Sequence, residues 1–214
     1  MSEEEIKNLI EKNLEKQTVS TETGLQLADK LKEIAEAENV DFAIAGGLAM
    51  HLYGFVRATL DVDFIANRRI SLEVKRHLSF GGERYEVEID GRKIDTDWIV
   101  RRDKYAQIYQ QALIDSVDIE GRKIISPEWL VILKYAAGRG KDRLDLLWLL
   151  QQKGLVNRKK IAQNLKNLLG ELGAIGFLTG LQREYDLADV MGARATGDEN
   201  ESYIPDEDHP EYND

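Results

Sequence analysis

Two aspartates, Asp61 and Asp63, stand one residue apart in an otherwise apolar segment, LDVDFIA, at residues 60–66. The alternation of polar and apolar residues predicts a strand on which both carboxylates point to the same face. At an effective dielectric constant near 20, two such charges about 5 Å apart repel each other by roughly 3 kcal/mol. That is a large fraction of the stability of a domain. Either one aspartate stays protonated, or a cation neutralises the pair.

The segment IDTDWIV, residues 94–100, repeats this pattern and places Asp95 and Asp97 on one face of a second predicted strand. If the two strands are neighbours, the second supplies a third carboxylate to the first two. Oxygen-only ligands select hard divalent ions, chiefly Mg²⁺ or Mn²⁺. Three carboxylates can hold two such ions about 3.5–4 Å apart, an arrangement that serves in-line displacement at phosphorus.

A glycine pair, Gly46 and Gly47, ends the apolar segment VDFAIA and precedes the first aspartate by about 14 residues. Between a strand and a helix, such a pair lets backbone N–H groups approach a phosphate, and the helix presents its positive end to that anion. Arg57 and Thr59 stand in the connection to the aspartates. There they can contact a phosphate or hold the loop.

The stretch GGLAMHLYGFVRATLDVDF, residues 46–64, resembles the signature of the nucleotidyltransferase (DNA polymerase β-like) superfamily. Within it, the stretch is most similar to the bacterial branch of toxin-like enzymes of the abortive-infection type. The matching residues are Gly46, Gly47, Ala49, Arg57, Thr59, Asp61, Asp63 and Phe64. The later segment SPEWLVILKYAAGRGKDRLDLLWLL is similar to a helical segment of the family, and the resemblance covers about residues 40–150.

The resemblance implies a nucleotidyltransferase that moves a nucleoside monophosphate from an NTP to an acceptor, with Mg²⁺ or Mn²⁺ as cofactor. Asp61 and Asp63 would be catalytic metal ligands. The third ligand would be Asp97, because the apolar residues after it match the family pattern, and Asp95 is the alternative.

The resemblance also implies that Gly46 and Gly47 hold the triphosphate. The further candidates for nucleotide binding are Arg57, Thr59, Lys134 and Asp142, with Asp145 as an alternative to Asp142. Many relatives carry Gly-Ser where this chain has Gly46-Gly47, so acceptor specificity does not transfer from them. The implied acceptors are RNA, protein or a small molecule, and a toxin-like role would bring an antitoxin partner.

The charge of the chain is uneven. Of 39 acidic and 29 basic residues, eight acids and no Lys or Arg lie in residues 197–214. The remainder, 31 acids against 29 bases, is near neutral and offers no large basic surface for RNA. The tail has the composition of a disordered segment.

The overall pattern predicts an α+β protein with a nucleotidyltransferase fold: a small mixed sheet flanked by helices, followed by a helical part. The predicted divisions are a core with N-terminal helices at 1–125, a helical region at 126–196 and the tail at 197–214. Helices are predicted over 3–16, 24–38, 71–80 and 104–113, the second of them with Thr21 or Thr23 as its N-cap. Hairpin turns are predicted at Asp90-Gly91 and near Gly121. Ser126 is the predicted N-cap of a helix that breaks at GRGK.

Other interpretations remain open at this stage. Asp61 and Asp63 can be strand-end residues bonded to the backbone or to Arg57, and the charges after Lys134 can be ordinary helix pairs. His51 is interpreted as a packed or capping residue. The chain can be a non-catalytic nucleotide-binding or regulatory module with the same fold, or a glycosyltransferase, which would need more sequence upstream. No cysteine and no long apolar run occur, so we expect a cytoplasmic protein with no membrane partner.

Overall fold

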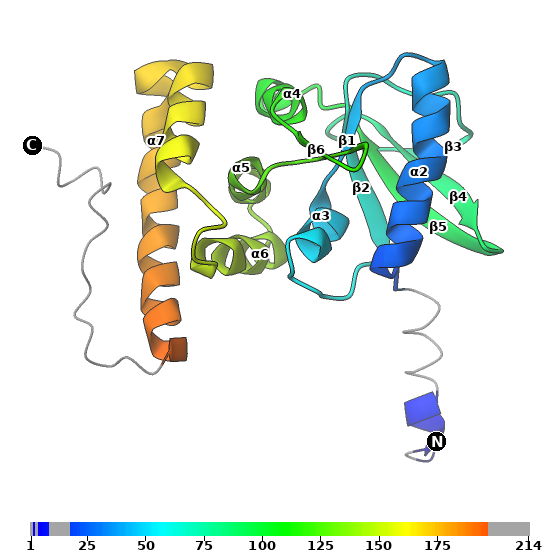
Figure 1. The fold of residues 1–214 in the computed structure, drawn as a ribbon, viewed down its shortest axis with the longest axis horizontal. Helices are drawn as coiled ribbons and strands as arrows, with labels where there is room; N and C mark the ends of the chain where they lie inside the picture. The colour runs from blue at the N-terminus through cyan, green and yellow to red at the C-terminus, as the bar shows by residue number, and fades with distance from the viewer. Residues whose placement is uncertain (1, 3, 9–17, 197–214) are drawn as a thin grey trace, which may run out of the picture. The chain divides into compact units, whose positions relative to one another are not determined.

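The computed structural model describes residues 2, 4–8 and 18–196. The chain divides into two compact units at Ile125 and Ser126, and each unit is described by itself (Figure 1). Residues 4–8 are helical. The rest of the helix predicted over 3–16 and the tail predicted over 197–214 lie outside the described residues.

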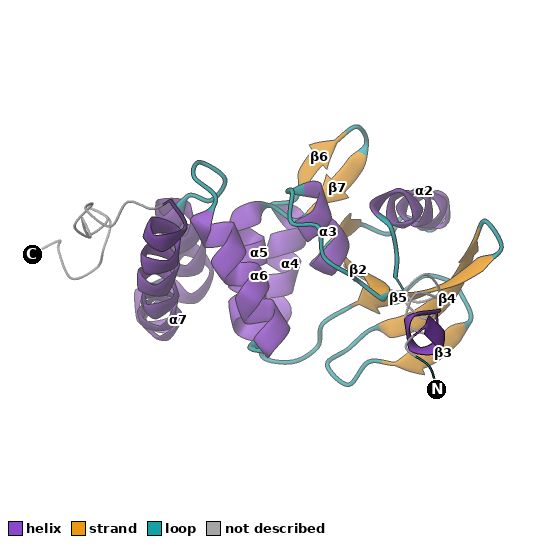
Figure 2. Cartoon of the chain, turned by 90° about the horizontal axis from the view of Figure 1, so that it is seen from below, coloured by secondary structure: helices purple, strands orange, loops and turns teal. Residues whose placement is uncertain are grey.

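The first unit is built on one mixed sheet of seven strands, in the order β3-β4-β5-β2-β1-β7-β6. The pairs β2–β5 and β1–β7 are parallel, and the other neighbours are antiparallel. The strands are β1 (Phe42–Ile44), β2 (Asp61–Ala66), β3 (Val74–His77), β4 (Glu83–Ile89), β5 (Arg92–Ile99), β6 (Val117–Ile119) and β7 (Arg122–Ile124). Besides residues 4–8, the helices described in this unit are α2 (Thr21–Ala37), α3 (Gly46–Leu52) and α4 (Ala106–Ile114) (Figure 2). The predicted α+β class is therefore confirmed.

One face of the sheet forms the hydrophobic core. The rings of Phe42, Phe64 and Trp98 pack together with centroids 5.0–5.9 Å apart. Trp98 donates from Nε1 to the carbonyl of Arg68 at 2.8 Å, which satisfies its polar atom in the core. The helix α2 packs against β4, whose buried residues alternate with exposed or half-buried charged ones. Arg84, Glu86 and Glu88 therefore point to the opposite face, whereas Glu83 is buried on the same side as Tyr85 and Val87.

The hairpin of β4 and β5 turns at Asp90-Gly91, as the sequence predicts. Both residues have positive φ, 48° and 75°, which is the backbone of a two-residue hairpin turn. The turn sets the register, which runs from Ile89 opposite Arg92 to Arg84 opposite Asp97. The second predicted hairpin also forms, between β6 and β7, with Gly121 at positive φ.

Two local predictions were wrong. Residues 71–80 do not form a helix: the strand β3 lies there and pairs with β4. Tertiary pairing outweighs the helical spacing because β4 offers a free edge, and Lys75 gains carboxylate partners in Glu86 of β4 and Asp95 of β5. The N-cap of α2 is Ser20, whose hydroxyl accepts from the backbone N–H of Thr23, so the cap is not Thr21 or Thr23.

The second unit is helical, with α5 (Pro127–Ala137), α6 (Gly140–Gln151) and α7 (Arg158–Thr196), which is kinked at Gly170. Ser126 is the N-cap of α5 as predicted, although its side chain makes no capping hydrogen bond. The predicted break at GRGK forms, because Gly138 takes a left-handed conformation that ends α5. In the described part of the chain, no helix has the length and apolar content that crossing a membrane demands.

A paired arginine joins the β6–β7 hairpin to α2. Arg122 contacts both oxygens of Asp29 at 2.7 Å, and this hydrogen bonding lowers the pKa of Asp29. A lowered pKa stabilises the fold above the unfolded pKa, and this contribution disappears as pH falls through the folded value. We expect Asp29→Asn to cost at most about 1 kcal/mol at neutral pH, because Asp29 is half exposed.

The same comparison at low pH tests the origin of that cost. In urea unfolding followed from neutral to acidic pH, the difference between Asp29→Asn and the parent should shrink, because the contribution of the ionised carboxylate is lost as pH falls through the lowered pKa of Asp29. An undiminished difference at low pH would contradict an ionic origin.

Candidate active site

Four aspartates lie together on the charged face of the sheet. Parallel pairing of β2 with β5 sets Asp61 beside Asp95 and Asp63 beside Asp97. Asp61 and Asp63 stand at the start of β2, and Ile65 and Ile99 follow the aspartates on the same side of the two strands. The condition left open by the sequence, that the two strands be neighbours, is therefore met in the fold.

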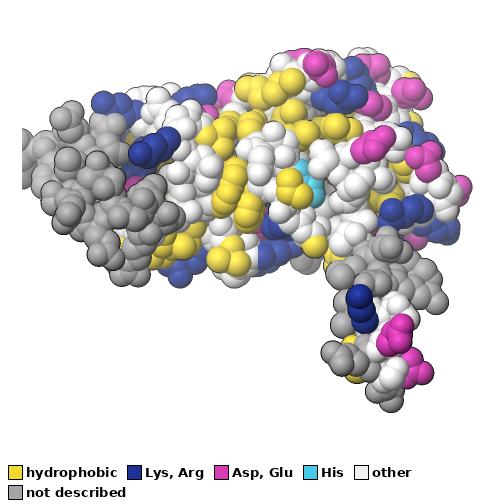
Figure 3. Space-filling view, turned by 60° about the horizontal axis from the view of Figure 1, so that its bottom comes forward, with side chains coloured by type: hydrophobic (Ala, Val, Ile, Leu, Met, Phe, Trp, Pro, Cys, Tyr) yellow, Lys and Arg dark blue, Asp and Glu magenta, His cyan; other side chains and the backbone are white. Residues whose placement is uncertain are grey.

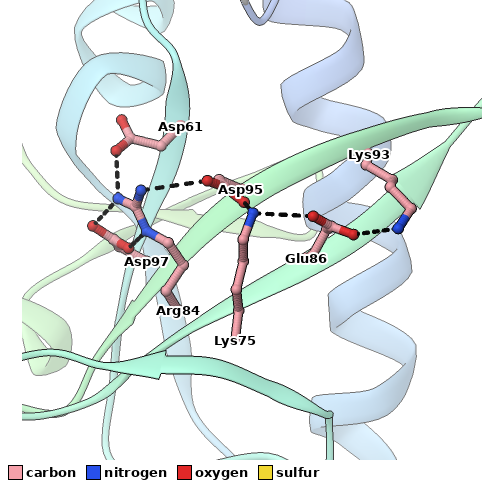
Figure 4. Close-up of polar contacts among 7 residues, drawn as sticks. All are labelled: Asp61, Lys75, Arg84, Glu86, Lys93, Asp95 and Asp97. Carbon is pink, nitrogen blue, oxygen red and sulfur yellow. Dashed lines mark hydrogen bonds and ion pairs between the residues drawn. The ribbon is translucent and has the colours of Figure 1, made fainter.

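A guanidinium group lies between these carboxylates. Arg84 of β4 contacts both oxygens of Asp97, with Nε at 2.5 Å and Nη2 at 2.7 Å (Figure 4). Its Nη2 also donates to Asp61 at 2.7 Å, and its Nη1 lies 3.5 Å from Asp95. Hydrogen bonding to Asp97 raises the pKa of Arg84 above its usual value, against the opposing effect of burial. Arg84 is therefore a fixed positive charge at the centre of the group.

Ion pairs continue along the sheet from the central group. Lys75 of β3 contacts Asp95 at 2.6 Å and Glu86 at 3.0 Å, and Lys93 contacts Glu86 at 2.6 Å (Figure 4). Hydrogen bonding to Asp95, and then to Glu86, raises the pKa of Lys75. Hydrogen bonding to Lys93, and then to Lys75, lowers the pKa of Glu86. The face carries alternating charges of both signs.

The central group keeps contact with solvent. The side chain of Asp61 is 25% exposed, that of Arg84 16% and that of Asp97 13%. The sequence left Arg57 open as an ion-pair partner of Asp61. In the structure, Arg84 forms this ion pair. The group is an open, partly desolvated site and not a sealed interior ion pair.

The expected divalent cation does not fit this arrangement. Within residues 4–8 and 18–196, no three acidic or histidine side chains are disposed to hold a metal ion. The donor chemistry suits Mg²⁺ or Mn²⁺, but Arg84 takes both oxygens of Asp97 and one of Asp61. The metal ligands expected from the sequence, Asp63 and Asp95 among them, stay a prediction.

The glycine pair lies against the aspartate strand. Gly46 has φ of 54°, and a Cβ on it would lie 1.8 Å from a carboxylate oxygen of Asp63. A Cβ on Gly47 would lie 2.7 Å from the hydroxyl of Thr59. Close packing therefore requires both glycines without reference to a ligand, and their contact with a triphosphate stays a prediction.

The loop from α3 to β2 is held by side-chain contacts to its backbone. The buried His51 contacts the backbone carbonyl of Arg57 through Nε2 at 2.5 Å, and its Nδ1 lies 3.2 Å from the hydroxyl of Thr21. The hydroxyl of Thr59 donates to the carbonyl of Asp61 at 2.9 Å. His51 is thus a packed residue, as interpreted from the sequence, and Thr59 braces the start of β2.

The other predicted nucleotide-binding residues belong to the second unit. Lys134 lies 3.1 Å from Asp142 and 2.6 Å from Asp145, and all three side chains are buried. Arg139 adds an i,i+3 pair to Asp142 at 2.5 Å. The fold brings these residues together as a buried ion cluster between α5 and α6, and a nucleotide contact by Lys134 or Asp142 stays a prediction.

Sequence reasoning missed Arg84 and Lys75. A signal for Arg84 was present, because counting residue pairs outward from the turn at Asp90-Gly91 sets Arg84 opposite Asp97. Lys75 had no such signal, since its segment was predicted as a helix.

Comparisons with known proteins give little. No protein-family model matches the chain. No curated protein matches it. Among solved structures, it is similar to an antigenic nucleotidyltransferase-like protein from Paracoccidioides brasiliensis, with 18% identity and a TM-score of 0.42. The match covers 71% of this chain and 89% of that one. A similarity so distant supports no statement about function. The functional argument rests on the carboxylates themselves.

Proposed function

We propose that the chain is a nucleotidyltransferase, which moves a nucleoside monophosphate from an NTP to an acceptor hydroxyl and releases pyrophosphate. The observation that carries the proposal is the in-register pairing of Asp61 with Asp95 and of Asp63 with Asp97 on one open face. Adjacent carboxylates on one face repel each other unless a cation lies among them, so the group suits a site that binds positive charge. The resemblance of residues 46–64 to the nucleotidyltransferase signature supports the same assignment.

In this proposal the residues divide by role. Asp61, Asp63 and Asp97 are the catalytic carboxylates, and Mg²⁺ or Mn²⁺ is the expected cofactor, whose chemistry is to polarise the phosphoryl oxygens. Arg84 has to leave the carboxylates before such an ion can bind there. Gly46 and Gly47 stay the candidates for contact with the triphosphate.

The acceptor is proposed only as a class. On the face that Figure 3 shows, the Lys and Arg side chains lie scattered among Asp and Glu and do not gather in one patch. This distribution favours a protein or small-molecule acceptor over a long RNA duplex. A toxin-like role with an antitoxin partner, and a cytoplasmic location, are supported by the sequence resemblance and composition alone.

Label transfer from the NTP tests the proposal. The protein is incubated with each of the four NTPs labelled at the α-phosphate, with Mg²⁺ or Mn²⁺ and a cell extract. The label should appear in one of the RNA, protein or small-molecule fractions. We expect Asp63→Asn to reduce transfer about tenfold or more. The control Glu88→Gln removes an exposed carboxylate from the same face of β4 and should leave transfer unchanged.

The second candidate function is a non-catalytic nucleotide-binding module, favoured by the contacts of Arg84 with Asp61 and Asp97. Absence of label in every fraction, together with saturable NTP binding in calorimetry, would support the module and reject the enzyme.

A further inference from the structure

We infer that Arg84 is the resident cation of the carboxylate group and excludes divalent ions from it until its side chain moves away. The inference rests on the proposed function in one respect, because it takes Asp61 and Asp97 as oxygen ligands. The inference goes beyond that function, because it assigns to Arg84 the role of a competitor of the divalent ion.

The contacts of Arg84 use the oxygens that a metal would need. Nε and Nη2 form a two-point contact with Asp97, and Nη2 also reaches Asp61, so one planar group bridges the two strands (Figure 4). A two-point contact between guanidinium and carboxylate is geometrically specific and stronger than a single ion pair. The oxygens engaged in this way are not available to a second cation.

The sheet determines this placement. Arg84 stands opposite Asp97 in the antiparallel register of β4 and β5, and Asp63 of β2 stands beside Asp97. Side chains of the same face in register partners are neighbours, so Arg84 extends over β5 toward β2. Its place opposite Asp97 follows from the register that the hairpin turn sets.

The charges around the aspartates explain why Arg84 and a divalent ion compete for the same place. Asp61, Asp95 and Asp97 contact Arg84, Asp63 is the register partner of Asp97, and Lys75 contacts Asp95 and Glu86. A divalent ion needs short contacts to several oxygens in near-octahedral geometry, and it is repelled by a guanidinium at the same oxygens. Binding of the ion and retention of Arg84 in its present contacts therefore exclude each other.

Binding of Mn²⁺ alone tests the inference without any reaction. Free Mn²⁺ is measured by electron paramagnetic resonance in titrations of the full chain at constant ionic strength. We expect Arg84→Gln to bind Mn²⁺ at least about tenfold more tightly than the parent. The control Lys93→Gln also removes one positive charge from this face, but Lys93 contacts only Glu86 among the residues of Figure 4, so its affinity should change less than about twofold.

Two further variants keep the result interpretable. Arg84→Lys retains the charge but loses the planar two-point contact, so its affinity should lie between those of the parent and Arg84→Gln. Adding Asp61→Asn to Arg84→Gln should abolish the gain. If Arg84→Gln does not fold without metal, its unfolding temperature should rise with Mn²⁺ more than that of the parent.

Equal Mn²⁺ affinity in the parent and in Arg84→Gln would overturn the inference, and so would a gain that survives Asp61→Asn. Tighter Mn²⁺ binding by Arg84→Gln, with no label transfer by any form of the protein, would uphold the inference and reject the proposed function.

Discussion

Gly46→Ala is expected to destabilise the first unit by about 3 kcal/mol or more and to reduce label transfer to background. Alanine at φ of 54° costs about 1–2 kcal/mol from backbone conformation alone. The added Cβ would also lie 1.8 Å from an oxygen and 2.7 Å from the Cβ of Asp63, so the carboxylate or the start of α3 has to move. The movement would displace Asp63 from its place beside Asp97.

A matched control separates the two costs. Gly91 also has positive φ, 75°, but a Cβ there would meet nothing within 4 Å. Gly91→Ala should therefore cost about 1–2 kcal/mol in urea unfolding and leave label transfer close to that of the parent. Equal losses of stability and of transfer in both variants would show that the contact with Asp63 is unimportant.

Lys134→Met is expected to destabilise the second unit by about 3–5 kcal/mol, because it removes the central cation of a buried cluster. Lys134 is 8% exposed, and Asp142 and Asp145 are each 1% exposed in their side chains. Loss of the ammonium leaves negative charge in a weakly polar interior, where the cost of desolvation is no longer offset. Thermal and urea unfolding followed by circular dichroism measure the change.

The control for this variant is Lys141→Met, which removes a lysine from the exposed side of α6 in the same unit. Its effect should stay within about 0.5 kcal/mol. Adding Asp145→Asn to Lys134→Met should recover part of the lost stability, because one buried charge is removed. A loss below about 1 kcal/mol for Lys134→Met would contradict an energetic role for the cluster.

The role of Lys134 in the second unit differs between the family resemblance and the fold. The resemblance implied that Lys134 contacts nucleotide, whereas the fold gives it two carboxylate partners, Asp142 and Asp145. The two aspartates lie eight and eleven residues after the lysine, beyond the three or four residues of a direct helix pair, and the helix breaks at Gly138 between the lysine and the aspartates. The pairing depends on how α5 and α6 pack, which no local pattern expresses.

Local chemistry was enough for much of the first unit. Alternation of apolar and polar residues predicted β2 and β5, and the Asp90-Gly91 pair predicted the turn between β4 and β5, because both signals act over a few residues. The segment at residues 71–80 failed because its strand exists only as an edge partner of β4. Its extended backbone conformation is determined by pairing with β4 and not by the propensities of its own residues.

The sequence by itself determined that carboxylates line one face of two strands and that glycines precede them. Only the tertiary structure decided what neutralises these charges. The parallel pairing of β2 with β5 joins segments about thirty residues apart, and it brings Arg84 of β4 within reach of Asp61. Alternation fixes the face on which a charge lies, but the cation that meets it depends on strand order, which is set by the packing of the whole sheet.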